Sequence, residues 1–264
     1  MKIAFWNTNK NTNINEVIRD IIRENKINIM VLAEYKDNIE CLIDMLNVFG
    51  LGMRKYLTIG CDRIVMLGNM EKMDQGNQGK HYTMQIINDD FVFCAMHLPS
   101  NIYGNSQEKR NIVIDSIVND INELEFERNT DKTIIIGDLN ENPYSPGCIE
   151  ASKFHGIPSG DDSSRVTRTI SGKAFKMFYN PMWNLLGDFQ FPPGTYYYDG
   201  STTNNSFWHI FDQVMIRPSL REQFVEEQLK ILTATNTISL LDENKHPNKE
   251  ISDHLPIVFE IKEL

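Results

Sequence analysis

Polar side chains that could take part in catalysis or metal binding follow apolar runs at several points in the chain. Four runs of strand-like composition end in this way: Lys2–Trp6 before Asn7, Ile29–Ala33 before Glu34, Phe91–Met96 before His97, and Thr133–Ile136 before Gly137, Asp138 and Asn140. A fifth, shorter run, His209–Phe211, leads into Asp212. Taken alone, GDLNEN (137–142) also suits a turn, because Gly, Asp and Asn tolerate turn dihedrals. The recurrence of the pattern favours a shared site, because ligands in α/β proteins commonly bind at strand ends.

The order reverses near the carboxyl terminus. Ser252, Asp253 and His254 come immediately before the apolar run Leu255–Ile261. A last strand that runs antiparallel to its neighbours begins beside their ends. We therefore expect all these polar groups to meet along one edge of the sheets.

The predicted cluster is rich in hard oxygen donors. Carboxylates come from Glu34, Asp138 and Asp253, neutral oxygens from Asn7 and Asn140, and no thiolate is nearby in sequence. This donor set favours Mg²⁺ or Mn²⁺ over zinc, and Mg²⁺ is typically shared between protein carboxylates and substrate phosphate oxygens. The chemistry that it predicts is phosphoryl transfer to water, with an aspartate that orients or deprotonates the water.

The elements that must position these residues alternate between helix and strand. Apolar residues at helical spacing predict helices from Ile14 behind Asn13, from Ile39 to near Gly50, and from Ser106 through Leu124. A capping-box pattern, Ser219 with Glu222, predicts a fourth helix through Leu229. Three β-rich runs, Arg63–Leu67, Tyr82–Ile87 and Phe91–Met96, predict a β-meander. The segment 74–80 (DQGNQGK) lacks the first glycine of a phosphate-binding loop and is predicted to be a hairpin loop.

Composition limits the possible classes. The 264 residues are 41% hydrophobic and carry 26 basic against 36 acidic side chains, a net charge of −10. Such a surface repels polyanions at long range, which disfavours unspecific binding of duplex DNA. No apolar run reaches membrane-spanning length, the first residues are strand-like, and the four cysteines have no metal-site spacing. We expect a single domain over residues 1–264, reduced cysteines that pack in the interior, no membrane partner and a cytoplasmic location.

The succession WN, strand-end E, HL, GDLN, a lone D and SDH resembles the endonuclease/exonuclease/phosphatase superfamily. That resemblance spans Asn7 to His254, in the order of the family. It implies an α/β (α+β) fold, a four-layer sandwich with two mixed β-sheets packed face to face and helices on the outside. It also implies a phosphoesterase that depends on Mg²⁺ or Mn²⁺.

Roles carry over from the resemblance position by position. Glu34 matches the principal metal ligand, with Asn7 and Asp253 close to the same site. Asp138 and Asn140 match the pair that positions the attacking water and the phosphate. His254 matches the histidine on the scissile phosphate, Asp212 the carboxylate that orients it, and His97 a position that is histidine or tyrosine in different branches. The base is assigned jointly to Asp138 and His254, and Gln213 departs from the residues usual after the matching aspartate.

Substrate choice depends on the segment Ser152–Asp199, which we expect to overhang the site. It mixes aromatic residues with basic ones, and four of the latter are candidate substrate contacts: Arg165, Arg168, Lys173 and Lys176. Basic and aromatic groups together suit a phosphate backbone and stacked bases, and a solvated loop is an equal interpretation. The leading function is a nuclease on DNA or RNA. The alternatives are a phosphomonoesterase, a lipid or small-molecule phosphodiesterase, or a non-catalytic binding module. No role is assigned to Asn9, His81, His155, His209 or His246.

Overall fold

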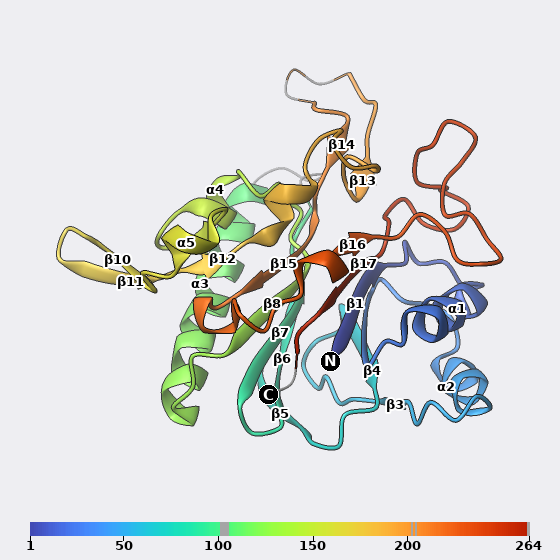
Figure 1. Ribbon diagram of the computed structural model, residues 1–264, viewed down its shortest axis with the longest axis horizontal. Coiled ribbons are helices and arrows are strands. Elements are labelled where there is room, and N and C mark those ends of the chain that lie inside the picture. The colour runs from blue at the N-terminus through green and yellow to red at the C-terminus, as the bar shows by residue number, and fades with distance from the viewer. Residues whose placement is uncertain (101–105, 202, 204, 263–264) are drawn as a thin grey trace.

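Two mixed β-sheets pack face to face, with helices on their outer faces (Figure 1). The computed structural model describes residues 1–100, 106–201, 203 and 205–262. Within them, the six-stranded sheet has the spatial order β16 (Lys230–Ile231), β17 (Ile257–Glu260), β1 (Lys2–Asn7), β2 (Ile29–Ala33), β4 (Ile64–Gly68) and β3 (Arg54–Lys55). The seven-stranded sheet has the order β5 (Met73–Gly79), β6 (Tyr82–Ile87), β7 (Phe91–His97), β8 (Thr133–Asp138), β15 (Asp212–Ile216), β12 (Phe178–Tyr179) and β9 (Gly156–Ile157). This is the four-layer sandwich that the sequence resemblance implies.

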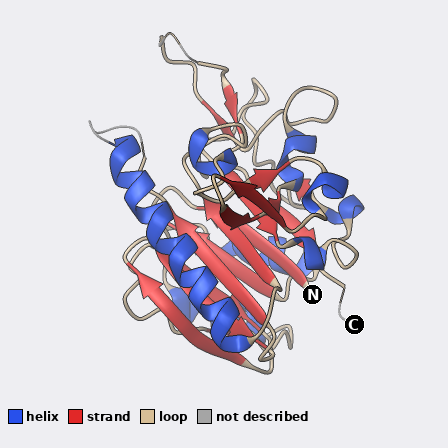
Figure 2. Ribbon diagram, turned by 90° about the vertical axis from the view of Figure 1, so that its left-hand side faces the viewer, coloured by secondary structure: helices blue, strands red, loops and turns tan. Residues whose placement is uncertain are grey.

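The helices divide between the two outer faces. The long helix α3 (Ser106–Arg128) crosses the seven-stranded sheet (Figure 2), whereas α1 (Asn15–Asn25) and α2 (Ile39–Asn47) cover the six-stranded sheet (Figure 1). Two further short helices are α4 (Pro146–Ile149) and α5 (Gly160–Ser163), and three 3-10 turns are η1 (Pro181–Leu185), η2 (Pro218–Leu220) and η3 (Glu226–Gln228). None of the helices in the described ranges has the length and apolar character that a membrane span requires.

Three apolar layers hold the sandwich together. The layer between the sheets includes Phe5, Val31, Phe93 and Ile136, all fully buried. A second layer lies under α1 and α2 and a third under α3. Full burial of such a side chain contributes about 1.5–3 kcal/mol, so these layers hold the strand ends in place.

Strand register brings the predicted polar residues to one edge. In the seven-stranded sheet, Asp138 is paired with His97 on one side and with Asp212 on the other. In the other sheet, β1 and β2 run parallel and end together, so that Asn7 is paired with Ala33, directly before Glu34. Strand β17 is antiparallel to β1, as expected, and so the residues just before it lie beside the end of β1.

Some local predictions were wrong. The segment after Ser219 contains only η2 and η3, because the Ser219 hydroxyl donates to the Asp131 carbonyl rather than capping a helix. The segment 74–80 is largely strand β5, and the meander is β5–β6–β7, while β4 belongs to the other sheet. Helix α1 begins after Ile14, and its first amides donate to Asp37 rather than to Asn13. All four cysteines are free, but Cys41 is exposed.

Two β-hairpins stand outside the sandwich. One is formed by β10 (Thr167–Ile170) and β11 (Lys173–Lys176), and it projects from the left side in Figure 1. The other is formed by β13 (Tyr196–Tyr197) and β14 (Trp208–His209), at the top of the same view. Only the second hairpin reaches the predicted site, since Tyr196 forms a β-bridge with His254.

Candidate active site

Asp138 lies at the centre of the polar edge, at the end of β8. Its side chain is only 1% exposed, so its carboxylate depends on protein partners. The backbone before it comes very close to β7: a Cβ on Gly137 would lie 2.0 Å from the Met96 carbonyl oxygen. Glycine is therefore required directly before the aspartate, and the reason for the glycine of the GDLN motif is steric.

Asn7 fixes one oxygen of Asp138 across the two sheets. Its Nδ2 donates to Asp138 Oδ2 at 3.0 Å, while its Oδ1 accepts from the Asn9 amide. In this orientation Asn7 positions the carboxylate, and the Asn9 amide uses one of the two lone pairs of its Oδ1. The buried carboxylate is a strong acceptor for the amide hydrogens, and Asn7 as a metal ligand stays a prediction.

Asn140 fixes the other oxygen of Asp138. The amide of Asn140 donates to Asp138 Oδ1 at 2.9 Å, and its side-chain nitrogen donates to the Leu98 carbonyl. The backbone of Asn140 has φ +50°, a left-handed conformation that asparagine tolerates better than most residues. The turn interpretation of GDLNEN is thus correct in part, and the turn itself orients the aspartate.

His254 and Asp212 form a buried hydrogen-bonded pair. Nδ1 of His254 lies 2.8 Å from Asp212 Oδ2, and Nε2 lies 3.9 Å from Asp138 Oδ2. The Asp212 amide donates to the Thr195 hydroxyl, and the His254 amide donates to Ser252, whose hydroxyl bonds the Asn7 carbonyl. Asp212 begins β15 rather than ending a strand, and this antiparallel start sets it opposite Asp138.

The charge of this pair follows from its surroundings. Burial alone would lower the pKa of His254, but the Asp212 and Asp138 carboxylates outweigh it and raise the pKa to about 10. Burial also raises the pKa of Asp212, and the neighbouring imidazolium opposes that shift. In the protein alone, the charged imidazole therefore balances part of the negative charge of the two carboxylates.

His97 and Glu34 complete the edge. His97 Nε2 lies 3.6 Å from Asp138 Oδ2 and 3.8 Å from Glu34 Oε1. The other ring nitrogen of His97 is buried and has no hydrogen-bond partner among the described residues. Glu34 has φ +52°, an uncommon conformation for glutamate that is typical of strained functional positions. The Lys10 ammonium lies 3.5 Å from Glu34 Oε2.

The residues present fit a divalent cation with oxygen ligands. The carboxylates of Glu34 and Asp138 come from different sheets, and they lie 3.8 and 3.6 Å from His97 Nε2. Within the described residues, the only group of three acidic, histidine or cysteine side chains with candidate ligand atoms inside 4.8 Å is Asp138, Asp212 and His254. Since Asp212 and His254 bond each other, the carboxylates of Asp138 and Glu34 are the candidate ligands for a cation at this edge.

Asp253 directly precedes His254 in the chain. It is half-buried and lines an open depression next to the site, and its role as a metal ligand stays a prediction. The Tyr196 ring packs 4.8 Å from the His254 ring. Burial, together with the carboxylates of Asp253 and Asp138, raises the pKa of Tyr196 to about 12, so its hydroxyl keeps its proton.

The four basic candidates lie apart from this cluster. Arg168 and Lys173 belong to the β10–β11 hairpin, and Arg165 pairs with Asp162 at its base. The Lys176 ammonium bonds the buried Glu125, which also pairs with Arg217. The last part of the segment Ser152–Asp199 reaches the site, because Tyr196 forms a β-bridge with His254. The basic residues are separated from it because the hairpin extends from the sheet edge next to β12 and β9.

Two histidines left without a role lie close to the site. Asn142 Nδ2 lies 3.0 Å from His209 Nδ1, and the His209 ring stacks on Phe211 at 4.8 Å. Phe211 stacks in turn on Tyr196 at 5.3 Å, so these rings form a wall beside His254. His81 Nδ1 lies 3.0 Å from the His97 carbonyl. One sequence signal could have placed His209 near the site. Side chains alternate along a strand, so residues 208–212 put His209 and Phe211 on one face.

Comparison with solved structures gives matches over the whole chain. An AP endonuclease from Archaeoglobus fulgidus has a TM-score of 0.59 at 13% identity, with 100% of both chains covered. A 3'-5' exonuclease from Neisseria meningitidis has a TM-score of 0.58 at 12% identity, again with 100% of both chains covered. The chain has the endonuclease/exonuclease/phosphatase fold. Truncated TDP2 from Caenorhabditis elegans matches at 17% identity and a TM-score of 0.53, covering 98% of this chain and 97% of that one.

The sequence itself is distant from known families. No family model matches it, and no curated protein matches it either. The likeness therefore concerns the fold, and activity must be argued from the site.

Proposed function

We propose that this protein is a metal-dependent phosphodiesterase, and that its substrate is a nucleic acid or nucleotide phosphodiester cleaved by water. The observation that carries the proposal is the position of Asp138. Both of its oxygens are held by hydrogen bonds, and the Nε2 atoms of His97 and His254 lie 3.6 and 3.9 Å from Oδ2. A buried carboxylate oriented in this way suits the positioning of a water molecule rather than fold stability.

Each group has a task in the reaction. Asp138 and His254 jointly orient the attacking water and the phosphate, and the water proton passes to this pair. The new bond joins the water oxygen to phosphorus, and the ester bond to the alcohol breaks with return of a proton to that alcohol. A divalent cation held by Glu34 and Asp138 would supply neutralisation of the phosphate charge. Asp212 keeps the His254 ring in place, and Asn7 and Asn140 keep Asp138 in place.

Nucleic acid as the substrate class draws support from the matched proteins. The Neisseria protein is described both as a 3'-5' exonuclease and as a 3' phosphatase bound to a product DNA hairpin. The test therefore includes a phosphomonoester substrate as well. A single domain over residues 1–264 is part of the proposal.

The proposal is tested with purified protein and four substrates: single-stranded DNA, RNA, bis(4-nitrophenyl) phosphate and 4-nitrophenyl phosphate. We expect hydrolysis of the diesters with Mg²⁺ or Mn²⁺, and loss of turnover in EDTA that the metal reverses. The Asp138→Asn variant is the control for contaminating enzymes. Preference for the monoester would favour the alternative, and binding of DNA without turnover of any substrate would favour a binding module.

A further inference from the structure

The hairpin beside His254 has two faces with different neighbours. Side chains alternate along a strand, so Tyr196 faces the catalytic residues while Tyr197 faces the other way. The Tyr197 ring lies on the His246 ring at 3.6 Å and an interplanar angle of 9°. Trp208 packs edge-on against both rings, at 5.3 Å from Tyr197 and 6.0 Å from His246. The hairpin is thereby clamped to the loop that precedes Asp253.

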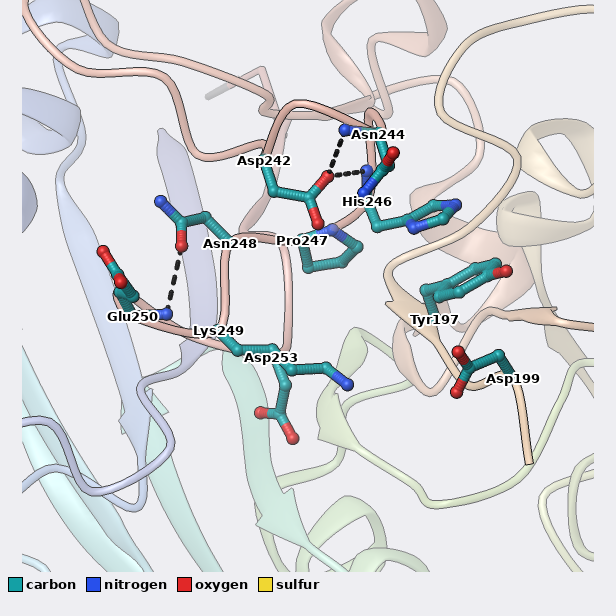
Figure 3. Close-up of a pocket in the computed structure, with 10 residues that line it drawn as sticks. All are labelled: Tyr197, Asp199, Asp242, Asn244, His246, Pro247, Asn248, Lys249, Glu250 and Asp253. Carbon is teal, nitrogen blue, oxygen red and sulfur yellow. Dashed lines mark hydrogen bonds between the residues drawn. The ribbon is translucent and has the colours of Figure 1, made fainter.

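Between this hairpin and the loop 242–250 lies an open depression of 340 Å³ (Figure 3). Tyr197 and Asp199 form one wall, the loop forms the opposite wall, and Asp253 lines the depression as well. Asp253 directly precedes His254, and Tyr197 directly follows Tyr196, whose ring packs on His254, so the depression borders the candidate active site. No part of the mechanism above uses this space.

Internal hydrogen bonds hold the loop 242–250 in shape without a ligand. Asp242 Oδ1 accepts from the amides of Asn244 and His246, each at 2.9 Å, as drawn in Figure 3. The amides of Ile251 and Ser252 both donate to the Asn248 carbonyl, at 2.8 and 2.9 Å. Asn11 donates to the carbonyls of Glu250 and Ile251. A preformed wall of this kind lowers the entropy cost of ligand binding.

The walls of the depression are polar and carry more acidic than basic side chains. Four carboxylates line the depression, Asp199, Asp242, Glu250 and Asp253, against one ammonium, Lys249. Asp199 and Lys249 make no ion pair within the described part of the chain, and in Figure 3 they extend toward each other from opposite walls. Carboxylates accept hydrogen bonds from hydroxyl and amino groups, and they repel a further phosphate. The ring edges of Tyr197 and His246 add apolar contact.

We infer that this depression binds the nucleoside next to the scissile phosphate, and that this nucleoside is a terminal one without a further phosphate. The inference rests on the proposed function, because it names the substrate group that the same site accepts. Sugar hydroxyls and base amino groups bond Asp199 and its neighbours, and the acidic walls exclude a chain that continues. The protein thus acts on strand ends or short nucleotides.

Chromogenic nucleoside esters test the inference directly. Thymidine 5'-(4-nitrophenyl phosphate) and its 3' isomer carry a nucleoside on one side, whereas bis(4-nitrophenyl) phosphate carries none. We expect one isomer to have a KM roughly tenfold or more below that of bis(4-nitrophenyl) phosphate, which corresponds to about 1.4 kcal/mol. A phosphate added to the free hydroxyl of that isomer should raise the KM again by a similar factor.

Variants assign the effect to the depression. Asp199→Asn should raise the KM for the preferred isomer and shrink the penalty for the added phosphate, with the KM for bis(4-nitrophenyl) phosphate unchanged. His246→Ala should raise the KM for the isomer, and His246→Phe should restore it by keeping the ring stack. Glu243→Gln, an exposed acid of the same loop outside the depression, is the matched control.

The outcomes separate the two proposals. If none of the esters is hydrolysed with Mg²⁺ or Mn²⁺, the proposed function itself is wrong. If all are hydrolysed with one KM and the variants change nothing, the phosphodiesterase stands and the nucleoside subsite is wrong. A preferred isomer whose KM rises equally in Glu243→Gln would also overturn the assignment to this depression.

Discussion

His254 Nδ1 lies 2.8 Å from Asp212 Oδ2, and this bond joins the two sheets. Asp212 begins β15 of the seven-stranded sheet, and His254 precedes β17 of the six-stranded sheet. Both side chains are buried, so each is the main charge partner of the other. The pair therefore works only when both sheets are packed together.

We expect Asp212→Asn and His254→Ala each to lower kcat by roughly 10²-fold or more, since a positioned acid or base contributes about 10²- to 10⁴-fold. The double variant should lose far less than the product of the two, because the residues act as one unit. Steady-state kinetics on bis(4-nitrophenyl) phosphate measures this. Independent, multiplying losses would contradict the paired role.

Glu34 and Asn7 should respond differently to metal. Glu34→Gln removes a charged ligand, so we expect roughly tenfold more Mg²⁺ to be needed for half-maximal activity, a change of about 1.4 kcal/mol. Asn7→Ala removes a hydrogen bond to Asp138, so it should lower kcat at saturating Mg²⁺ with little change in that concentration. Titration of activity with Mg²⁺ in both variants distinguishes them. Equal metal shifts would show that Asn7 is a metal ligand as well.

The basic residues of the outer hairpin give a prediction about long substrates. Arg165, Arg168 and Lys173 are exposed, so contacts to a phosphate backbone would release counterions. If they touch a polymer, replacing all three with Gln raises the KM for a long oligonucleotide and flattens its salt dependence. A dinucleotide, too short to reach the hairpin, is the control. An unchanged salt slope would remove these residues from the substrate path.

Glu125 should matter for stability rather than for catalysis. Its carboxylate is held by Arg217 and Lys176, and Arg217 is 3% exposed. Glu125→Gln leaves that guanidinium without its buried partner, which costs about 3–5 kcal/mol of unfolding free energy. Lys176→Gln is the matched control, with a loss of about 0–1 kcal/mol, because Lys176 is partly solvated. Urea denaturation measures both, and similar losses would contradict the buried pair.

His155 should make stability depend on pH. Burial, reinforced by Arg168 and Arg217, lowers its pKa below the usual 6.5. The unfolded chain then binds a proton that the folded chain does not, so the unfolding free energy is full above pH 6.5 and falls as the pH decreases below it, by at most about 1.4 kcal/mol per pH unit. The loss levels off below the folded pKa.

The check on His155 is a variant. His155→Gln keeps a donor for the Lys176 carbonyl but has no titrating group. We expect a smaller drop in unfolding free energy between pH 7.5 and pH 5.5 than in the unchanged protein, measured by urea denaturation. His81 and His209, whose pKa values are also lowered by burial, retain the rest of the slope. An unchanged slope would show that His155 is not responsible.

The sequence by itself determined which residues end the strands. The apolar runs before Asn7, Glu34, His97 and Asp138 are local patterns, and parallel neighbours then bring their ends to one edge. The reversal before β17 was equally readable, because an antiparallel strand begins where its neighbours end. Oxygen donors without thiolates pointed to a hard cation at the same stage.

Tertiary structure alone decided the partners of those residues. The Asp212 bond to His254, the orientation of Asn7 toward Asp138 and the placement of Lys176 on Glu125 all join segments far apart in the chain. The absence of the helix predicted after Ser219 also depends on a distant contact. The Ser219 hydroxyl donates to the Asp131 carbonyl and does not cap a helix. Such contacts depend on sheet packing and strand register. Many distant side chains set these together, and no local pattern encodes them.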